Sequence, residues 1–408
     1  MFKTRLLVVA SYPIKTPLHG GQKRTTALLS KYRQVSNSVS FMGIFLKGSY
    51  SSYSKYDLPI TDDSVIDQVN SQPEYTDIIV GNAVLNEKIT KMKFIKALLK
   101  INPQVIHVEQ PYMVSSISKI LSEMNMNPVI ILGSQNVEAE LKHSIYKGVL
   151  GSTALRKLVE STQRVEDNAV AIANIITAVS TYDLVKHMER ARSKRKFYFV
   201  VSNGIDAHKR SLKKVHQWQT YKKRHSLDNL ILFVGSGHPP NFIGFEKLVS
   251  NINLDSHSRI FIVGGVGEYF IKKYADKNDI FWKNISVLGV LKEPELNGLI
   301  DSADILLLPI LHGGGSNLKT AEAILSHKKI VATEYAFRGF EQYIHMPNVY
   351  IGNSNRSFKK ALLNAIKTPL LPLSKKQIRH TERVTWARAL GKLRVVALLS
   401  ALVYKFKM

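Results

Sequence analysis

The chain has 408 residues and carries 57 Lys and Arg against 31 Asp and Glu, which gives a formal net charge of +26. This length fits two domains of ordinary size, and an apolar fraction of 45% is enough to build a sizeable core. The sequence contains no cysteine, which excludes disulfides and thiolate metal sites and fits a reducing compartment such as the cytosol. Such an excess of positive charge favours a polyanionic partner, namely nucleic acid, anionic lipid or a phosphorylated substrate.

No targeting or membrane-spanning segment is predicted. The apolar run near the N-terminus has the length of a strand and lacks the longer apolar region of a signal peptide. No stretch reaches the ~18 apolar residues that a membrane helix needs.

The first half of the chain alternates between strand-like and helix-like patterns. Residues 49–73 are rich in Ser and Tyr and show no periodicity, so we expect a long loop there. Strands are predicted at 5–10, 38–46, 104–109, 129–133 and 174–180, and helices at 22–32, 85–101, 114–124 and 137–146.

The predicted helix at 85–101 is basic and amphipathic. Its apolar positions recur at helical spacing, and most of its lysines lie elsewhere on the helix. Such a helix could cover a sheet or lie on an anionic membrane surface. The apolar positions are Leu85, Ile89, Met92, Ile95 and Leu99, and the lysines are Lys88, Lys91, Lys93, Lys96 and Lys100.

The second half shows the same alternation of strand-like and helix-like patterns. Strands are predicted at 230–234, 260–263, 285–288, 305–309, 330–333 and 349–351, and helices at 241–251, 293–302 and 354–366. Two successive arrays of this kind predict an α/β fold with two doubly wound, Rossmann-like domains facing each other across a cleft, at 1–200 and 201–370. A break marked by Pro369 and Pro372 introduces a basic tail, 371–408, which carries nine Lys and Arg against one acid.

The stretch 305–333 has the strongest chemical signal. A buried strand is followed by three glycines, then by Ser316 and Asn317 as a plausible helix N-cap, a helix and a second strand. Glycines let the backbone approach a ligand, and the N–H groups at a helix start favour an anion. Lys319 and Glu322 lie on one face of that helix, which suits a diphosphate and a ribose diol. The alternative is a flexible glycine loop with both charges solvated.

The sequence lacks the motifs of several common nucleotide-binding and metal-binding sites. The dinucleotide-binding glycine motif should follow the first strand, but Ser11, Tyr12 and Pro13 stand there, and the later run 264–267 has the wrong spacing. No phosphate-binding P-loop occurs, and the histidines are scattered, so no metal site is predicted. Nucleic acid is not favoured either, because no recognised binding motif or aromatic platform accompanies the basic residues.

The chain resembles family 4 glycosyltransferases of the GT-B fold in several stretches, which occur in the order expected for that family. The resemblance is carried by Gly20 and Gly21, the turn SNGID at 202–206, VGS at 234–236 with Pro240 and Asn241, and Gly289 with the segment 293–306. The most specific match is GGGSNLKTAEA at 313–323, which is similar to the subgroup pattern "GGGTRLKVLEA".

The resemblance implies transfer of a sugar from a nucleoside-diphosphate sugar, with retention at the anomeric carbon, without a metal or other cofactor, and with a C-terminal helix returning to the first domain. Ser316, Asn317, Leu318 and Lys319 would hold the diphosphate and Glu322 the ribose, while the main chain at Val290 and Leu291 would flank the base. The remaining donor residues implied are Gly20, Gly21, Asn203, Gly235, Ser236, Gly313, Gly314 and Gly315.

Two positions depart from the family pattern. Gly314 stands where a sugar-contacting Glu is common, and Ser236 stands where many members carry an Arg. Lys319 is therefore expected to be the main cation on the diphosphate, with Glu322 beside it.

On the acceptor side, His107 and Glu109 alternate along one strand, and one of them is expected to act near the reacting sugar. A satisfied core histidine is an equally good interpretation of His107. Glu138, in SQNVE, resembles the family's "HDVE" and could cap its helix rather than catalyse.

The tail supports two interpretations. Residues 395–404 could pack on the first domain. The nearby basic residues could instead attach the protein peripherally to the cytoplasmic face of an anionic membrane. That location would suit saccharide or lipid-linked acceptors of cell-surface polysaccharide or glycolipid synthesis. Three alternatives to a transferase remain open: a basic nucleic-acid-binding protein without enzymatic activity, a nucleotide-sugar epimerase of the same fold, and a non-catalytic relative.

Overall fold

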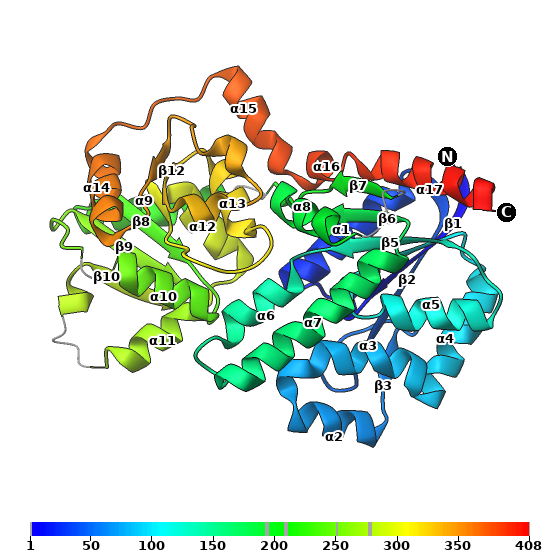
Figure 1. Ribbon diagram of the computed structural model, residues 1–408. Helices are drawn as coiled ribbons and strands as arrows, with labels where there is room; N and C mark the ends of the chain where they lie inside the picture. Colours follow the sequence, from blue (N-terminus) through cyan, green and yellow to red (C-terminus); the bar gives the residue numbers. More distant parts are fainter. Residues whose placement is uncertain (1, 192–195, 208–210, 250–251, 276–279, 408) are drawn as a thin grey trace. The chain divides into compact units, whose positions relative to one another are not determined.

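The computed structural model describes residues 2–191, 196–207, 211–249, 252–275 and 280–407 (Figure 1). The chain divides into two compact units, each built on one parallel sheet. The first unit comprises 1–203, 314–316 and 389–408, and the second comprises 204–313 and 317–388.

The first sheet has seven parallel strands in the order β3-β2-β1-β4-β5-β6-β7. Because β1 lies between β2 and β4, the strand order reverses between β1 and β4, which is where open α/β sheets bind ligands. The strands are β1 (Phe2–Ala10), β2 (Ser36–Leu46), β3 (Leu58–Ile60), β4 (Val105–Glu109), β5 (Val129–Ser134), β6 (Ile175–Ala178) and β7 (Phe197–Val200).

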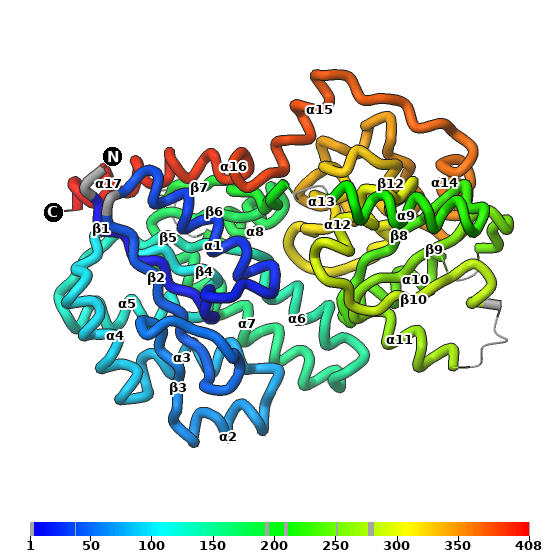
Figure 2. Tube along the Cα trace, turned by 180° about the vertical axis from the view of Figure 1, so that it is seen from behind, coloured from blue at the N-terminus to red at the C-terminus, as the bar shows by residue number. Residues whose placement is uncertain are grey.

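Helices cover both faces of this sheet. Alternate residues of β1 point to opposite faces, and Leu7 and Val9 join a core with Phe94 and Ile117. The helix α17 packs against α1, β4 and β5, and it lies on the other side of the sheet from α4 and α5 (Figures 1 and 2). The helices are α1 (Gly20–Arg33), α2 (Asp63–Ser71), α3 (Thr76–Asn86), α4 (Lys88–Ile101), α5 (Val114–Glu123), α6 (Glu138–Tyr146), α7 (Ser152–Ile172), α8 (Thr181–Arg190) and α17 (Leu393–Lys407).

Two predictions for the first unit were wrong. Residues 49–73 are not one loop, because β3 extends the sheet edge beside β2 and α2 follows it. The predicted helix 85–101 is interrupted at Glu87, whose carboxylate accepts hydrogen bonds from the backbone of Ile89 and Thr90 and so starts α4. Leu85 therefore belongs to α3, and the buried face of α4 is formed by Thr90, Phe94 and Leu98.

The second sheet has six parallel strands in the order β10-β9-β8-β11-β12-β13, and its order reverses between β8 and β11. Its strands are β8 (Asn229–Val234), β9 (Ser258–Val263), β10 (Ile285–Gly289), β11 (Ile305–Leu308), β12 (Lys329–Ala332) and β13 (Val349–Ile351). Its helices are α9 (Leu212–Arg224), α10 (Pro239–Leu248), α11 (Val266–Lys273), α12 (Glu293–Ser302), α13 (Leu318–Ser326) and α14 (Asn355–Lys367).

Two separate cores lie on the two faces of the second sheet. One contains Leu299 of α12 and Ala321 of α13, and the other contains Phe245 of α10 and Phe358 of α14. The predicted α/β fold with two Rossmann-like domains and a returning C-terminal helix is thus confirmed.

The tail divides between the two units. Residues 371–388, which include α15 (Lys375–Thr381), belong to the second unit, where Ile205 pairs with Thr385. The short helix α16 (Trp386–Ala389) leads into α17 of the first unit. Within the described ranges, no helix is both long and apolar enough to cross a bilayer.

Candidate functional site

Two connections leave the second sheet where its strand order reverses. β8 and β11 are parallel neighbours, so their carboxyl ends meet at the same edge. Gly235 and Ser236 follow β8, and the glycine-rich connection 309–317 follows β11. The sequence-predicted donor residues of these two connections therefore leave from neighbouring strands, at the place where doubly wound sheets bind ligands.

The glycines after β11 adopt backbone conformations that other residues rarely adopt. Gly313 has φ 139° and Gly315 has φ 57°, whereas Gly314 has no such requirement. The carbonyl of Gly313 accepts hydrogen bonds from the Tyr335 hydroxyl and from Arg338 Nη1, the latter at 3.0 Å. These contacts place a guanidinium beside the loop. Arg338 was missed from the sequence, since it lies 25 residues further along the chain and matches no motif.

Helix α13 begins directly after this connection. The side chain of Asn317 is the N-cap and accepts a hydrogen bond from the backbone N–H of Lys319 at 3.2 Å, as predicted. The side-chain nitrogen of Asn317 has no hydrogen-bond partner among the described residues. Leu318 is partly buried against the core. The start of α13 therefore offers backbone and side-chain donors to an anion.

A chain of polar contacts joins α13 to the end of β8. Lys319 Nζ donates to Oδ1 of Asn241 at 2.7 Å, and Asn241 Nδ2 donates to the carbonyl and the hydroxyl of Ser236 at 2.9 and 3.1 Å. Burial lowers the pKa of Lys319 to about 8, against the opposing attraction of Glu322. Lys319 and Ser236, two residues predicted from sequence, are thus linked through Asn241, and Glu322 acts on Lys319 by electrostatic attraction.

The predicted base-flanking residues lie further along the same edge. Gly289 ends β10 with φ 66°, and its carbonyl accepts from the backbone N–H of Gly264 at 2.7 Å. Val290 follows with 76% of its surface exposed, and Leu291 is partly buried against the core. An exposed apolar side chain at this position is available for contact with a planar ring.

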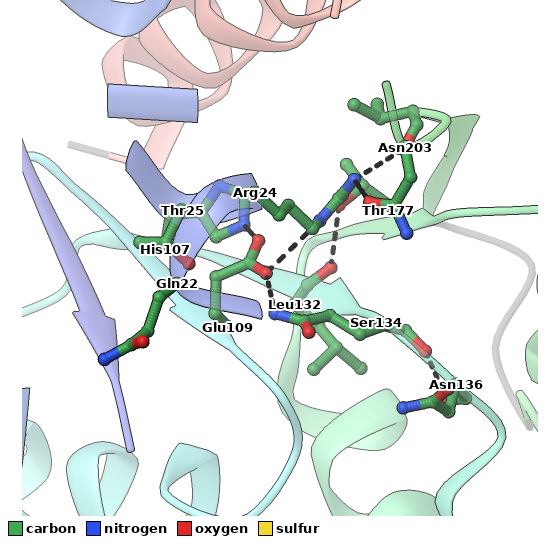
Figure 3. A network of polar contacts seen from close by, with 12 residues as sticks. Gln22, Arg24, Thr25, His107, Glu109, Leu132, Ser134, Asn136, Thr177 and Asn203 are labelled. Atoms are coloured by element: carbon green, nitrogen blue, oxygen red, sulfur yellow. Dashed lines mark hydrogen bonds and ion pairs between the residues drawn. The ribbon is translucent and has the colours of Figure 1, made fainter. Parts of the chain in front are cut away.

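In the first unit, His107 and Glu109 are the centre of a buried polar network (Figure 3). Glu109 accepts hydrogen bonds from Arg24 Nε at 3.3 Å and from Gln135 Nε2 at 2.6 Å, and it lies 3.0 Å from His107 Nε2. On its other side, His107 Nδ1 lies 2.8 Å from the hydroxyl of Tyr32. The structure therefore brings the two predicted acceptor-side residues together, but His107 is fully buried and Glu109 is 2% exposed.

The charge of Glu109 is balanced inside this network. Burial alone would raise the pKa of its carboxyl, but Arg24, His107 and Gln135 hold that pKa below its usual value. Arg24 continues the network, since its Nη1 donates to the carbonyl of Val201 and to Oδ1 of Asn203, both at 3.0 Å. The Arg24–Glu109 pair thus connects α1 and β4 to Asn203, which was predicted to be a donor residue. Arg24 was missed from sequence because it looks like one more cation on a basic helix.

The expectation that Glu138 caps its own helix was wrong. The first backbone N–H groups of α6, those of Glu138 and Ala139, donate to the carboxylate of Glu166 on α7. The Glu138 carboxyl instead accepts from the Tyr112 hydroxyl and from Asn136. Burial raises the pKa of Glu138 to about 8, so this carboxyl is largely protonated at neutral pH.

A cavity of about 270 Å³ opens where the order of the first sheet reverses. Gln110, directly after β4, has a left-handed backbone with φ 69°, and such outliers cluster at functional sites. Gly21, on the first turn of α1, lines the cavity, and a Cβ there would lie 3.0 Å from the Tyr12 hydroxyl. Gly20 opens the same helix. The lining consists of Ser11, Tyr12, His19, Gly21, Phe45, Leu46, Ser49, Tyr50, Thr76, Asp77, Val80, Gln110 and Gln135.

The lining of this cavity contrasts with the charge of the whole chain. It contains aromatic, amide and hydroxyl groups and one carboxylate, Asp77, but no Lys or Arg. Burial lowers the pKa of His19, so that residue is neutral at pH 7. The cavity therefore suits a neutral, hydroxyl-rich ligand better than a phosphate. Within the described part of the chain, no cluster of three or more metal-binding side chains occurs.

Comparison with known proteins identifies the fold. No protein-family model and no curated protein matches the sequence. Among solved structures, sucrose-phosphate synthase from Thermosynechococcus elongatus matches with a TM-score of 0.68 at 12% identity, covering 98% of this chain and 100% of that one. Anabaena HepE in complex with UDP matches with a TM-score of 0.66 at 12% identity, covering 97% and 100%.

The lipopolysaccharide outer core galactosyltransferase WaaB also matches, with a TM-score of 0.60 at 10% identity, covering 96% of this chain and 99% of that one. All three likenesses extend over nearly the whole chain. They show that the protein has the GT-B fold, while membership of family 4 stays a prediction.

Proposed function

We propose that this protein is a retaining, metal-independent glycosyltransferase that moves a sugar from a nucleoside-diphosphate sugar to a saccharide or lipid-linked acceptor. The observation that carries the proposal is the contact of Lys319 with Asn241 beside the capped start of α13. A cation, several N–H donors and a glycine loop gather there at the switch point of the second sheet. Structural neighbours solved with UDP and with UDP-glucose support a donor of this class.

In this proposal each part of the donor site has its own role. The N–H groups at the start of α13 and the Lys319 ammonium would neutralise the diphosphate, whose negative charge grows as the sugar–phosphate bond breaks. Glu322, one turn further along α13, would accept hydrogen bonds from the ribose hydroxyls. Arg338, held at the carbonyl of Gly313, would add positive charge beside the glycine loop, in a chain that has Ser236 where the family pattern has an Arg.

The acceptor would occupy the cavity of the first unit. Its hydroxyl oxygen would attack the anomeric carbon from the face that the phosphate leaves, and its proton would pass to the departing phosphate oxygen. Such a transfer needs no protein base, which agrees with the nearly complete burial of His107 and Glu109. In this proposal these two residues position β4 and the cavity beside it. The first glycines of α1, Gly20 and Gly21, would allow close approach of a substrate.

The test is a panel of nucleoside-diphosphate sugars incubated with the protein, with release of the nucleotide as the readout. A transferase releases nucleoside diphosphate from one member of the panel, faster when a saccharide or lipid-linked acceptor is added. An epimerase of the same fold would convert the sugar in the absence of acceptor. Salt-sensitive binding to random DNA without turnover of any donor would instead support a nucleic-acid-binding protein and overturn the proposal.

A further inference from the structure

The last described helix is apolar on both of its sides. Leu393, Val396, Ala397 and Ser400 are buried where α17 packs against α1, β4 and β5. The opposite side is formed by Val395, Leu402 and Phe406, which are 51%, 51% and 90% exposed. We refer to Val395, Leu399, Leu402 and Phe406 as the outer face of α17.

The spacing of these residues makes the outer face one continuous strip. At 3.6 residues per turn, positions 395, 399, 402 and 406 fall within roughly 60° of one another around the helix axis. Three exposed cations lie close to the strip in sequence: Lys392 in the turn directly before α17, and Arg394 and Lys405 on the helix itself. The sequence has no Asp or Glu after Glu382.

A helix of the second unit shows what a water-facing side normally looks like. In α14 the buried residues are Phe358, Ala361, Leu362 and Ala365. Its exposed residues are Asn355, Arg356, Lys359, Lys360, Asn364 and Lys367, all of them polar. Both helices thus bury one apolar side, but only α17 repeats an apolar strip on the side away from the sheet. Exposed apolar strips rimmed by polar groups mark interaction sites.

The orientation of α17 is fixed by contacts at its end. Lys407 Nζ donates to Oδ1 of Asn127, to Oδ1 of Asn174 and to the carbonyl of Pro128, at 3.2, 3.1 and 3.4 Å. Together with the buried side, these bonds hold the helix on the sheet. The outer face is therefore presented outward by a preformed helix.

A second basic helix provides a comparison. α4 exposes Ile89, Met92 and Leu99, but Lys96 lies between Ile89 and Met92 around the helix, so its apolar residues form no continuous strip. Figures 1 and 2 place α4 on the other side of the first sheet from α17. One flat surface therefore cannot contact both helices.

We propose that the outer face of α17 docks on an anionic lipid surface. The apolar strip would enter the boundary between headgroups and acyl chains, and Lys392, Arg394 and Lys405 would lie at the lipid phosphates. Charge complementarity selects this occupant, because an acid-free strip with exposed cations close to it on a strongly basic protein would repel a second copy of itself. This proposal is independent of the transferase reaction.

The test is co-sedimentation of the full chain with phosphatidylcholine vesicles, with and without phosphatidylglycerol. Wild type is expected to bind the anionic vesicles and to lose affinity as salt rises. Leu402→Ser/Phe406→Ser should weaken that binding at least tenfold, since two apolar side chains no longer enter the bilayer. Lys392→Glu/Lys405→Glu, which leaves the packed side of α17 intact, should weaken it similarly.

The matched control is Met92→Ser/Leu99→Ser on α4, which should bind as wild type does. Equal loss of binding in the Ser variants of α4 and α17 would overturn the proposal, because binding would then not depend on the outer face of α17. Wild-type binding by both α17 variants would overturn it too. A third outcome would also overturn it: no binding to vesicles, together with a dimer that sedimentation velocity detects without lipid and that the Leu402→Ser/Phe406→Ser variant abolishes. Unchanged thermal unfolding of each variant shows that the comparison is between folded proteins.

Discussion

The ammonium of Lys319 lies 2.7 Å from the side-chain oxygen of Asn241, a neutral acceptor supplied by α10. A carboxylate at this distance would neutralise the lysine, whereas an amide orients it and leaves its charge for a ligand. Asn241 is itself held by Ser236 at the end of β8. The site therefore presents an oriented cation beside the start of α13, and its affinity for anions can be tested directly.

Replacing Lys319 by Ala is expected to abolish transfer while leaving the fold intact. The lost charge stabilises the leaving diphosphate, and removing one such group typically costs about 10²–10³ in rate. Glu322→Ala should also abolish transfer, through loss of the ribose contact. The measurement is kcat/KM with the donor that the panel identifies, alongside thermal unfolding. Lys360→Ala on α14 is the control, and near wild-type turnover in either site variant would remove the assignment.

Affinity for the nucleoside diphosphate is expected to fall above pH 8. Burial lowers the pKa of Lys319 to about 8, and a bound diphosphate would raise it again. Above pH 8 binding must therefore take up a proton, which weakens it by up to about tenfold per pH unit. Titration calorimetry between pH 7 and pH 10 would measure this dependence.

Lys319→Arg is the control for this pH dependence, because a guanidinium stays charged throughout the range. Its affinity should be nearly flat between pH 7 and pH 10. A wild-type affinity that is equally flat would show that no proton is linked to binding at Lys319.

The two sheets and the donor loop were predictable because their signals are local. Apolar runs marked most strands, and the glycines, Asn317 and Lys319 lie within seven residues of one another. The buried pair of Arg24 and Glu109 was not predictable, since its partners are 85 residues apart. The break between α3 and α4 was missed for a related reason: the apolar period runs through Glu87, and only its capping bonds show that the chain stops and restarts there.

Removing Arg24 is expected to destabilise the first unit strongly. Both side chains of the Arg24–Glu109 pair are almost fully buried, and Arg24→Met would leave the buried Glu109 carboxylate without its guanidinium partner. Breaking a buried pair in this way costs about 3–5 kcal/mol. Arg24→Met/Glu109→Gln should recover part of that loss, because the amide keeps hydrogen bonds without the charge. Urea unfolding of wild type, both single variants and the double variant measures the coupling.

The stabilising contribution of the Arg24–Glu109 pair is expected to fall at acidic pH. The pKa of Glu109 is lowered in the folded protein, since Arg24, His107 and Gln135 outweigh the effect of burial. Its stabilising contribution is therefore present above the unfolded pKa of about 4.3 and is lost as pH falls through the folded value. The stability difference between wild type and Arg24→Met should shrink on acidification. A difference that grows below pH 4 would contradict this account.

Glu138→Gln is expected to stabilise the protein increasingly as pH rises from 5 to 8. In the folded state burial raises the pKa of Glu138 to about 8, whereas in the unfolded chain the carboxyl ionises near 4.3. Between these values the unfolded state loses a proton that the folded state keeps, so ionisation favours unfolding. Glutamine removes this penalty and can still accept from Asn136 and bond to the Tyr112 hydroxyl. The melting temperature of the variant should exceed that of wild type by a margin that widens up to about pH 8 and then levels off. A margin that narrows over this range would show that Glu138 is ionised in the folded protein.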